Sequence, residues 1–104
     1  MTKSFLPYGR HQIDESDILA VNNVLRSDYL TTGFAVSSFE RSLAETTGSK
    51  HAVVCSSGTA ALHLASMSLN IKSGDTVIVP AITFLSTANA VRFTGAEVIF
   101  SDVN

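Results

Sequence analysis

The sequence predicts an α/β fold with a parallel-type sheet that helices cover on both faces. From residue 52 onward the pattern alternates strand, helix, strand, helix and strand. The expected strands are short runs of apolar and β-branched residues, which is typical of parallel strands buried on both faces. Turn residues separate these runs, and the stretches between them carry apolar residues at helical spacing.

The expected organisation has two parts within one truncated domain. Residues 1–50 comprise an N-terminal arm and two helices, and residues 51–104 comprise an incomplete βαβαβ unit. Asp14 has the chemistry of an N-cap for the first helix, which is expected to end near Arg26. The second helix is expected over residues 35–47, with Gly48 as its stop.

The stretch H-A-V-V-C-S-S-G-T-A-A-L-H-L-A-S-M-S-L, residues 51–69, organises the second part. It predicts a buried strand over residues 52–55, a tight turn, and a helix that begins near Thr59. The helix has apolar residues at i, i+1, i+4 and i+8, which form one stripe: Ala61, Leu62, Ala65 and Leu69.

The turn S-S-G-T has the features of a phosphate cradle. Free backbone N–H groups and the helix dipole meet at the start of the helix, and Gly58 allows an anion to approach closely. The hydroxyls of Ser56, Ser57 and Thr59 are further donors. The alternative is an ordinary strand-to-helix connection in which Ser57 is the N-cap and no ligand binds. No Walker A lysine, dinucleotide fingerprint or hydrolase elbow is present.

Two more strands and a helix complete the pattern. Residues 76–79 predict a buried strand ended by Pro80, residues 81–85 a loop, residues 86–94 a helix, and residues 97–101 a third strand. In parallel α/β sheets, ligands bind beyond the carboxyl ends of the strands.

Composition narrows the class of protein. The 104 residues are 45% hydrophobic and only 15% charged, so we expect a partner subunit or further chain to bury part of the apolar surface. The net charge of −2 without a basic run gives no support to binding of nucleic acid or membrane. No spanning segment or signal peptide is recognisable, which predicts a cytoplasmic protein. Cys55 is expected to be a buried, inert thiol, and no metal site is expected.

An ordered set of short motifs spans almost the whole chain: F-L-P-Y-G-R, S-D-Y-L-T-T-G, S-S-G-T-A-A-L-H, G-D-T-V-I-V-P-A-I-T-F and T-A-N-A-V. In this order and spacing they resemble the N-terminal part of a DegT/StrS-type sugar-nucleotide aminotransferase. Such enzymes are pyridoxal-phosphate (PLP) enzymes of fold type I, and the chain would be part of their large PLP-binding domain. P-Y-G-R and I-T-F-L-S-T-A-N-A-V most resemble the subgroup that aminates UDP-4-keto-6-deoxy-N-acetylhexosamines, on the route to pseudaminic-acid-type sugars.

The resemblance implies roles for two groups of residues. The cofactor phosphate would lie at Ser57, Gly58, Thr59 and Ala60, and Phe84 would stack on the pyridine ring. Without the resemblance, a core phenylalanine is the simpler interpretation of Phe84. The sugar nucleotide would lie near the loop that contains Thr31, Thr32 and Gly33. The implied partners are a second subunit in a homodimer, a UDP-sugar and an amino-acid donor, namely glutamate. His63 is expected to be structural.

The lysine that forms a Schiff base with the cofactor in this family has no counterpart here. Lys3, Lys50 and Lys72 all lie outside matching positions. A lysine amine is needed both to hold the cofactor and to relay a proton. The chain alone is therefore expected to be an inactive, truncated piece with no catalytic residue of its own. Two alternatives remain: a small stand-alone α/β module that binds a phosphorylated ligand or a protein, and a structural remnant without activity.

Overall fold

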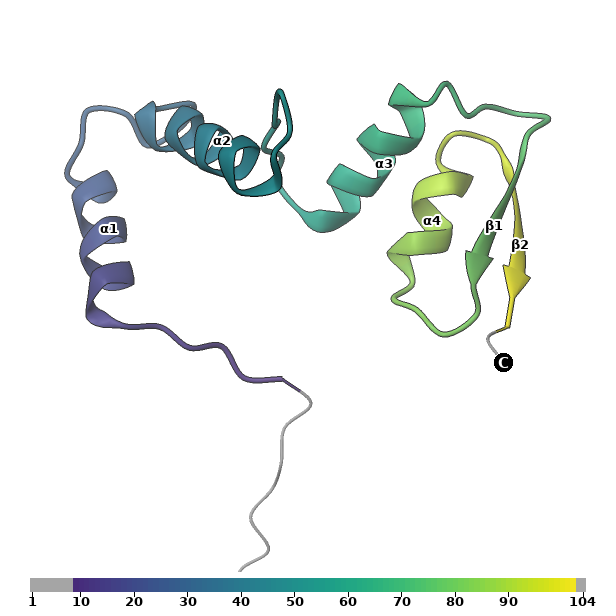
Figure 1. Cartoon of the computed structure of the whole chain (residues 1–104), viewed down its shortest axis with the longest axis horizontal. Helices are drawn as coiled ribbons and strands as arrows, with labels where there is room; N and C mark the ends of the chain where they lie inside the picture. The colour runs from purple at the N-terminus through teal and green to yellow at the C-terminus, as the bar shows by residue number, and fades with distance from the viewer. Residues whose placement is uncertain (1–8, 103–104) are drawn as a thin grey trace, which may run out of the picture. The chain divides into compact units, whose positions relative to one another are not determined.

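The computed structural model describes residues 9–102, which fall into two compact units divided between His51 and Ala52 (Figure 1). Most of the expected N-terminal arm, including Lys3, lies outside the described residues. The first unit contains the helices α1 (Glu15–Leu25) and α2 (Phe34–Thr47). The second contains α3 (Gly58–Ser68), β1 (Thr76–Pro80), α4 (Ser86–Arg92) and β2 (Glu97–Ser101).

Local hydrogen bonds fix the start of α1. An oxygen of the Asp14 carboxylate, Oδ1, accepts from the backbone N–H of Ser16 at 2.8 Å and of Asp17 at 3.2 Å. In return, Oδ2 of Asp17 accepts from the N–H of Asp14 at 3.0 Å, which completes a capping box. The prediction of Asp14 as the N-cap is confirmed.

The end of α2 is fixed by a glycine in the left-handed conformation. Gly48 has a φ of 67°, and the N–H of Ser49 reaches back to the carbonyl of Ala44 at 3.0 Å. A residue with a side chain would be strained at this φ. The predicted stop at Gly48 is confirmed, and α2 begins at Phe34, one residue before the predicted start.

In the second unit, β1 and β2 pair in parallel, with Thr76 opposite Glu97 and Pro80 opposite Ser101. Two bonds extend the ladder beyond the paired residues: the N–H of Glu97 donates to the Asp75 carbonyl at 2.9 Å, and that of Ala81 to the Ser101 carbonyl at 2.8 Å. Pro80 lacks an N–H and stands at the last position of its strand, where least pairing is lost.

A small core joins α4 to one face of this sheet. Val79, Ala88, Val91 and Ala96 are buried together, and Ile71, Val77 and Val98 pack around them. The predicted parallel α/β arrangement is confirmed. On the other face, Ile78 and Ile99 are opposite each other in register and are 69% and 54% exposed. Within residues 9–102, helices therefore cover one face of the sheet, not both.

The predicted strand over residues 52–55 is wrong. The described sheet has two strands, β1 and β2, so the unit is βαβ preceded by α3 instead of βαβαβ. An apolar run becomes a strand only when a neighbouring strand completes its hydrogen-bond ladder, and neither β1 nor β2 pairs with this segment. Cys55, expected to be buried, is half-buried, and its thiol contacts the Ser57 carbonyl at 3.4 Å.

The apolar stripe of α3 is not the face that packs among the described residues. All four residues of the apolar stripe are exposed. The less exposed residues of α3 follow a different helical stripe: Thr59, Ala60, His63 and Ser66. Apolar periodicity identifies an apolar face but does not determine which face meets a neighbour. Among the described elements that neighbour is α4, against which α3 packs.

The capping box makes the helicity of α1 sensitive to acid. The hydroxyl of Ser16, followed by the N–H groups of Asp17 and Ser16, donates to the Asp14 carboxylate and lowers the Asp14 pKa below its ordinary value of 3.8. This stabilisation is complete above the ordinary pKa and is lost as the pH falls through the lower pKa of the folded state. We expect the NMR-derived helicity of residues 15–25 to fall more steeply between about pH 5 and pH 2 in the parent than in Asp14→Asn, whose amide oxygen also caps but does not titrate. Equal acid loss in both proteins would contradict this.

Candidate functional site

The start of α3 carries the first group of predicted site residues. Ser57 has extended backbone angles, φ −163° and ψ 161°, and is the N-cap of α3. Its Oγ accepts from the N–H of Ala60 at 3.2 Å, and its carbonyl accepts from the N–H of Ala61 at 3.0 Å. The interpretation of Ser57 as an N-cap is therefore confirmed.

Two of the four first-turn N–H groups remain available. Ser57 takes those of Ala60 and Ala61, whereas the N–H groups of Gly58 and Thr59 have no acceptor among residues 9–102. Both groups lie at the positive end of an 11-residue helix. A Cβ built on Gly58 would have no heavy atom within 4 Å, so there is open space on the side of Gly58 where a side chain would lie. The φ of Gly58 is not positive, so the backbone conformation does not require a glycine at this position. The glycine matters here because it has no side chain to obstruct a ligand.

The loop between β1 and α4 carries Phe84, whose side chain is 76% exposed. Phe84 is therefore not part of the core of the described residues, contrary to the simpler interpretation of this position. The loop is tied to α4 by a hydrogen bond between the hydroxyls of Thr83 and Thr87 at 2.8 Å and by the N–H of Thr87, which donates to the Phe84 carbonyl at 3.0 Å. Both α3 and α4 start toward the end of the unit at which the strand arrows point (Figure 1).

The first unit holds the second predicted group in the loop between α1 and α2. Thr32 has a φ of 52°, an unusual left-handed conformation for a β-branched residue. Its hydroxyl donates to the Thr31 carbonyl at 2.7 Å. Gly33 is the N-cap of α2, and a Cβ there would lie 3.0 Å from the Tyr29 carbonyl oxygen. The loop thus turns tightly back on itself between Tyr29 and Gly33.

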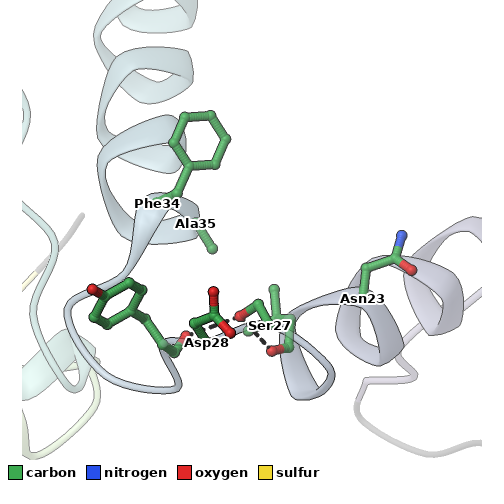
Figure 2. A pocket seen from close by; sticks show the side chains of 7 residues that line it. Asn23, Ser27, Asp28, Phe34 and Ala35 are labelled. Carbon is green, nitrogen blue, oxygen red and sulfur yellow. Dashed lines mark hydrogen bonds between the residues drawn. The ribbon is translucent and has the colours of Figure 1, made fainter.

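A cavity of about 330 Å³ lies beside this loop, between the end of α1 and the start of α2 (Figure 2). Ser27 anchors the wall, because its Oγ donates to the Val24 carbonyl at 2.7 Å and contacts the Tyr29 carbonyl at 3.1 Å. The lining residues are Asn23, Val24, Ser27, Asp28, Tyr29, Phe34 and Ala35. Thr31, Thr32 and Gly33 are not among them, although they connect its walls.

None of the motifs in the sequence predicts this cavity. Its lining combines two exposed aromatic rings, Tyr29 and Phe34, with the polar side chains of Asn23 and Asp28. Aromatic residues at both ends of a Thr-Thr-Gly loop are a signal for such a hollow, but the contribution of Asn23 depends on how α1 meets the loop.

The comparisons assign the chain to a family. The DegT/DnrJ/EryC1/StrS aminotransferase family matches residues 11–104, so the chain belongs to it. Among curated proteins, the UDP-4-amino-4-deoxy-L-arabinose–oxoglutarate aminotransferase of Shewanella sediminis is 46% identical over all 104 residues. The chain spans 27% of the length of that relative.

Two solved structures extend the comparison. A Streptococcus pneumoniae protein described as a sugar aminotransferase, in its PLP form, is 34% identical, with a TM-score of 0.87 over 95% of this chain and 25% of that one. A GDP-4-keto-6-deoxymannose-3-dehydratase with a trapped PLP-glutamate geminal diamine is also 34% identical, with a TM-score of 0.85 over 94% of this chain and 27% of that one. The α/β fold of this family is therefore confirmed.

The residues at the start of α3 fit a phosphate group. Two N–H donors without an acceptor among the described residues, an open approach at Gly58 and the helix dipole are what a phosphate monoester requires. The described lysines are elsewhere: Lys50 follows α2, and Lys72 lies in a turn where its backbone N–H donates to the Asp75 carboxylate oxygen Oδ2 at 2.9 Å. None of the helices in the described part of the chain is long and apolar enough to cross a bilayer.

The left-handed Thr32 predicts a stabilising substitution. Thr32→Gly removes a side chain from a conformation that costs about 1–2 kcal/mol, and the added backbone entropy of glycine offsets about 0.5–1 kcal/mol of that gain. We expect the free energy of unfolding in urea to rise by up to about 1 kcal/mol. Thr31→Gly, at a position without positive φ, is the matched control and should lower it. A loss of stability in Thr32→Gly equal to that in Thr31→Gly would show that the left-handed backbone carries no cost.

Proposed function

We propose that this chain is the N-terminal part of a PLP-dependent aminotransferase that acts on a nucleotide sugar, and that the start of α3 binds the cofactor phosphate. One observation carries the proposal: in a chain of this family, the N–H groups of Gly58 and Thr59 have no acceptor among the described residues, and a Cβ on Gly58 would meet nothing within 4 Å. Solved relatives that contain PLP support the choice of ligand.

Different residues of this chain hold the phosphate and the pyridine ring of the cofactor. Gly58 and Thr59 donate N–H groups to the phosphate, and the hydroxyl of Ser57 is free to donate while its oxygen keeps the N–H of Ala60 in place. Ala60 itself contributes by closing the first turn. The exposed ring of Phe84 stacks on the pyridine ring by an offset contact. When bound, PLP supplies the electron sink for amino-group transfer.

The substrate side of the proposal rests on the first unit. Thr31, Thr32 and Gly33 lie near the sugar nucleotide, which we propose is a UDP-4-keto-6-deoxy-N-acetylhexosamine with glutamate as the amino donor. The name of the Shewanella sediminis relative, which contains both a UDP-4-amino sugar and oxoglutarate, supports this class of substrate and donor. A homodimer is consistent with the many exposed apolar side chains, such as Ile18 at 52% and Leu25 at 65%.

The cradle predicts an order of effects in the full-length polypeptide that contains this sequence. Gly58→Val should weaken PLP binding more than Phe84→Ala, and Phe84→Ala more than Ser56→Ala. A valine side chain fills the approach to two charge-assisted hydrogen bonds worth roughly 1.5–3 kcal/mol each, so we expect affinity to fall at least about tenfold. The measurement is the dissociation constant from absorbance titration.

Because nothing lies within 4 Å of a Cβ at Gly58, the valine variant should retain its fold, which far-UV circular dichroism checks. Ser56→Ala is the matched control, since Ser56 is exposed and its hydroxyl has no partner among the described residues. A folded Gly58→Val protein with parental affinity would place the phosphate elsewhere.

A second prediction concerns the lysines. None of the three matches the family's cofactor-binding position, so the isolated 104-residue chain should neither transaminate a keto sugar nor retain PLP covalently after borohydride reduction. Mass spectrometry of the reduced protein is the measurement. One lysine carrying a full equivalent of cofactor would contradict the proposal that the chain lacks this residue.

A further inference from the structure

We infer that His63 is a positioning residue, which holds the start of α3 in register with the loop before α4 through a contact with Phe93. The inference rests on the proposed function, because it concerns how the cofactor site is held together. His63 is not among the proposed cofactor-binding residues, so its role is to orient the groups that are.

The contact is a ring pair between two helices. The imidazole of His63, in the middle of α3, and the ring of Phe93, at the C-cap of α4, have centroids 5.4 Å apart and planes inclined by 67°. This edge-to-face geometry is the favoured arrangement of aromatic pairs. It is the one aromatic ring pair found among the described residues, and it joins α3, which carries the proposed phosphate donors, to α4, which follows the loop that contains Phe84.

The position of His63 on α3 links this contact to the phosphate site. Residues three and four apart lie on the same side of a helix, so His63 lies one helical turn after Ala60 and Thr59, on the same side of α3. These residues and Ser66 form the less exposed stripe of α3. A shift of the helix at His63 therefore moves the N–H donor of Thr59 with it.

Phe93 links the same contact to the loop that carries Phe84. Its N–H donates to the Asn89 carbonyl at 2.9 Å, which makes the ring part of the last turn of α4. At the other end of α4, Thr87 connects the helix to this loop through its hydrogen bonds. The ring pair thus links the helix that carries the phosphate donors to the helix that follows the stacking ring, and a rigid ligand such as PLP has to match both ends.

The test uses the full-length polypeptide loaded with PLP and the variants His63→Ala, His63→Phe, Phe93→Ala and the double alanine variant. We expect His63→Ala to weaken PLP binding about twofold to tenfold, the range for one lost aromatic pair. Phe93→Ala should do the same, and the double variant should be no worse than either single variant. His63→Phe, which keeps a ring against Phe93, should restore the parental dissociation constant.

A second measurement separates positioning from general stability. The visible-region circular dichroism of PLP, per mole bound at saturation, reports the orientation of the cofactor against the protein. It should change in both single alanine variants and return in His63→Phe. His51→Ala, which removes an exposed imidazole at the end of the first unit, is the matched control and should leave the dissociation constant and the spectrum unchanged.

The outcomes are distinguishable. If the parent binds PLP but the alanine variants lose only urea resistance, with parental affinity and spectrum, the ring pair is structural only and the inference is wrong. If His63→Ala does not fold, Phe93→Ala, which removes a 59% exposed side chain, decides the same question. If the parent itself does not bind PLP, the proposed function fails and the inference fails with it.

Discussion

Parallel strands cannot be joined by a tight turn, and this constraint arranges everything described after residue 75. The chain leaves β1 at Pro80 and has to return along the sheet before β2 begins, so α4 crosses over and buries Val91 against Val79. The crossover places the loop with Phe84 at the carboxyl end of β1. This is the edge at which parallel sheets bind ligands, so the fold and the proposed stacking role have the same cause.

The elements that the sequence predicted well are those with local determinants. Asp14 and Gly48 set helix ends through hydrogen bonds to residues at most five positions away, and such bonds form whatever the rest of the chain does. The strand expected over residues 52–55 failed for the opposite reason, and the apolar stripe of α3 did not indicate which face of that helix packs. Both depend on a strand or helix that is distant in sequence. An apolar pattern indicates that a segment needs such a neighbour, but it does not indicate which element is the neighbour.

The same difference between local and long-range determinants applies to the candidate site. Ser57 was predictable as an N-cap because a serine before a helix bonds its own first turn. The left-handed Thr32 was not, because β-branched residues disfavour this conformation. The cavity beside that loop depends on Asn23 and Phe34 from two different helices, and no single stretch of sequence contains that information.

The two solved relatives limit what this segment can decide about chemistry. One is described as a sugar aminotransferase and the other as a dehydratase, yet both are 34% identical to this chain and match its fold equally closely. A feature common to both cannot select between their reactions. Under the proposed function, the N–H donors at Gly58 and Thr59 and the ring of Phe84 bind and orient the cofactor. Under this interpretation, substitutions at these positions change how tightly PLP is held, and the choice between amino transfer and dehydration rests on residues that act on the substrate.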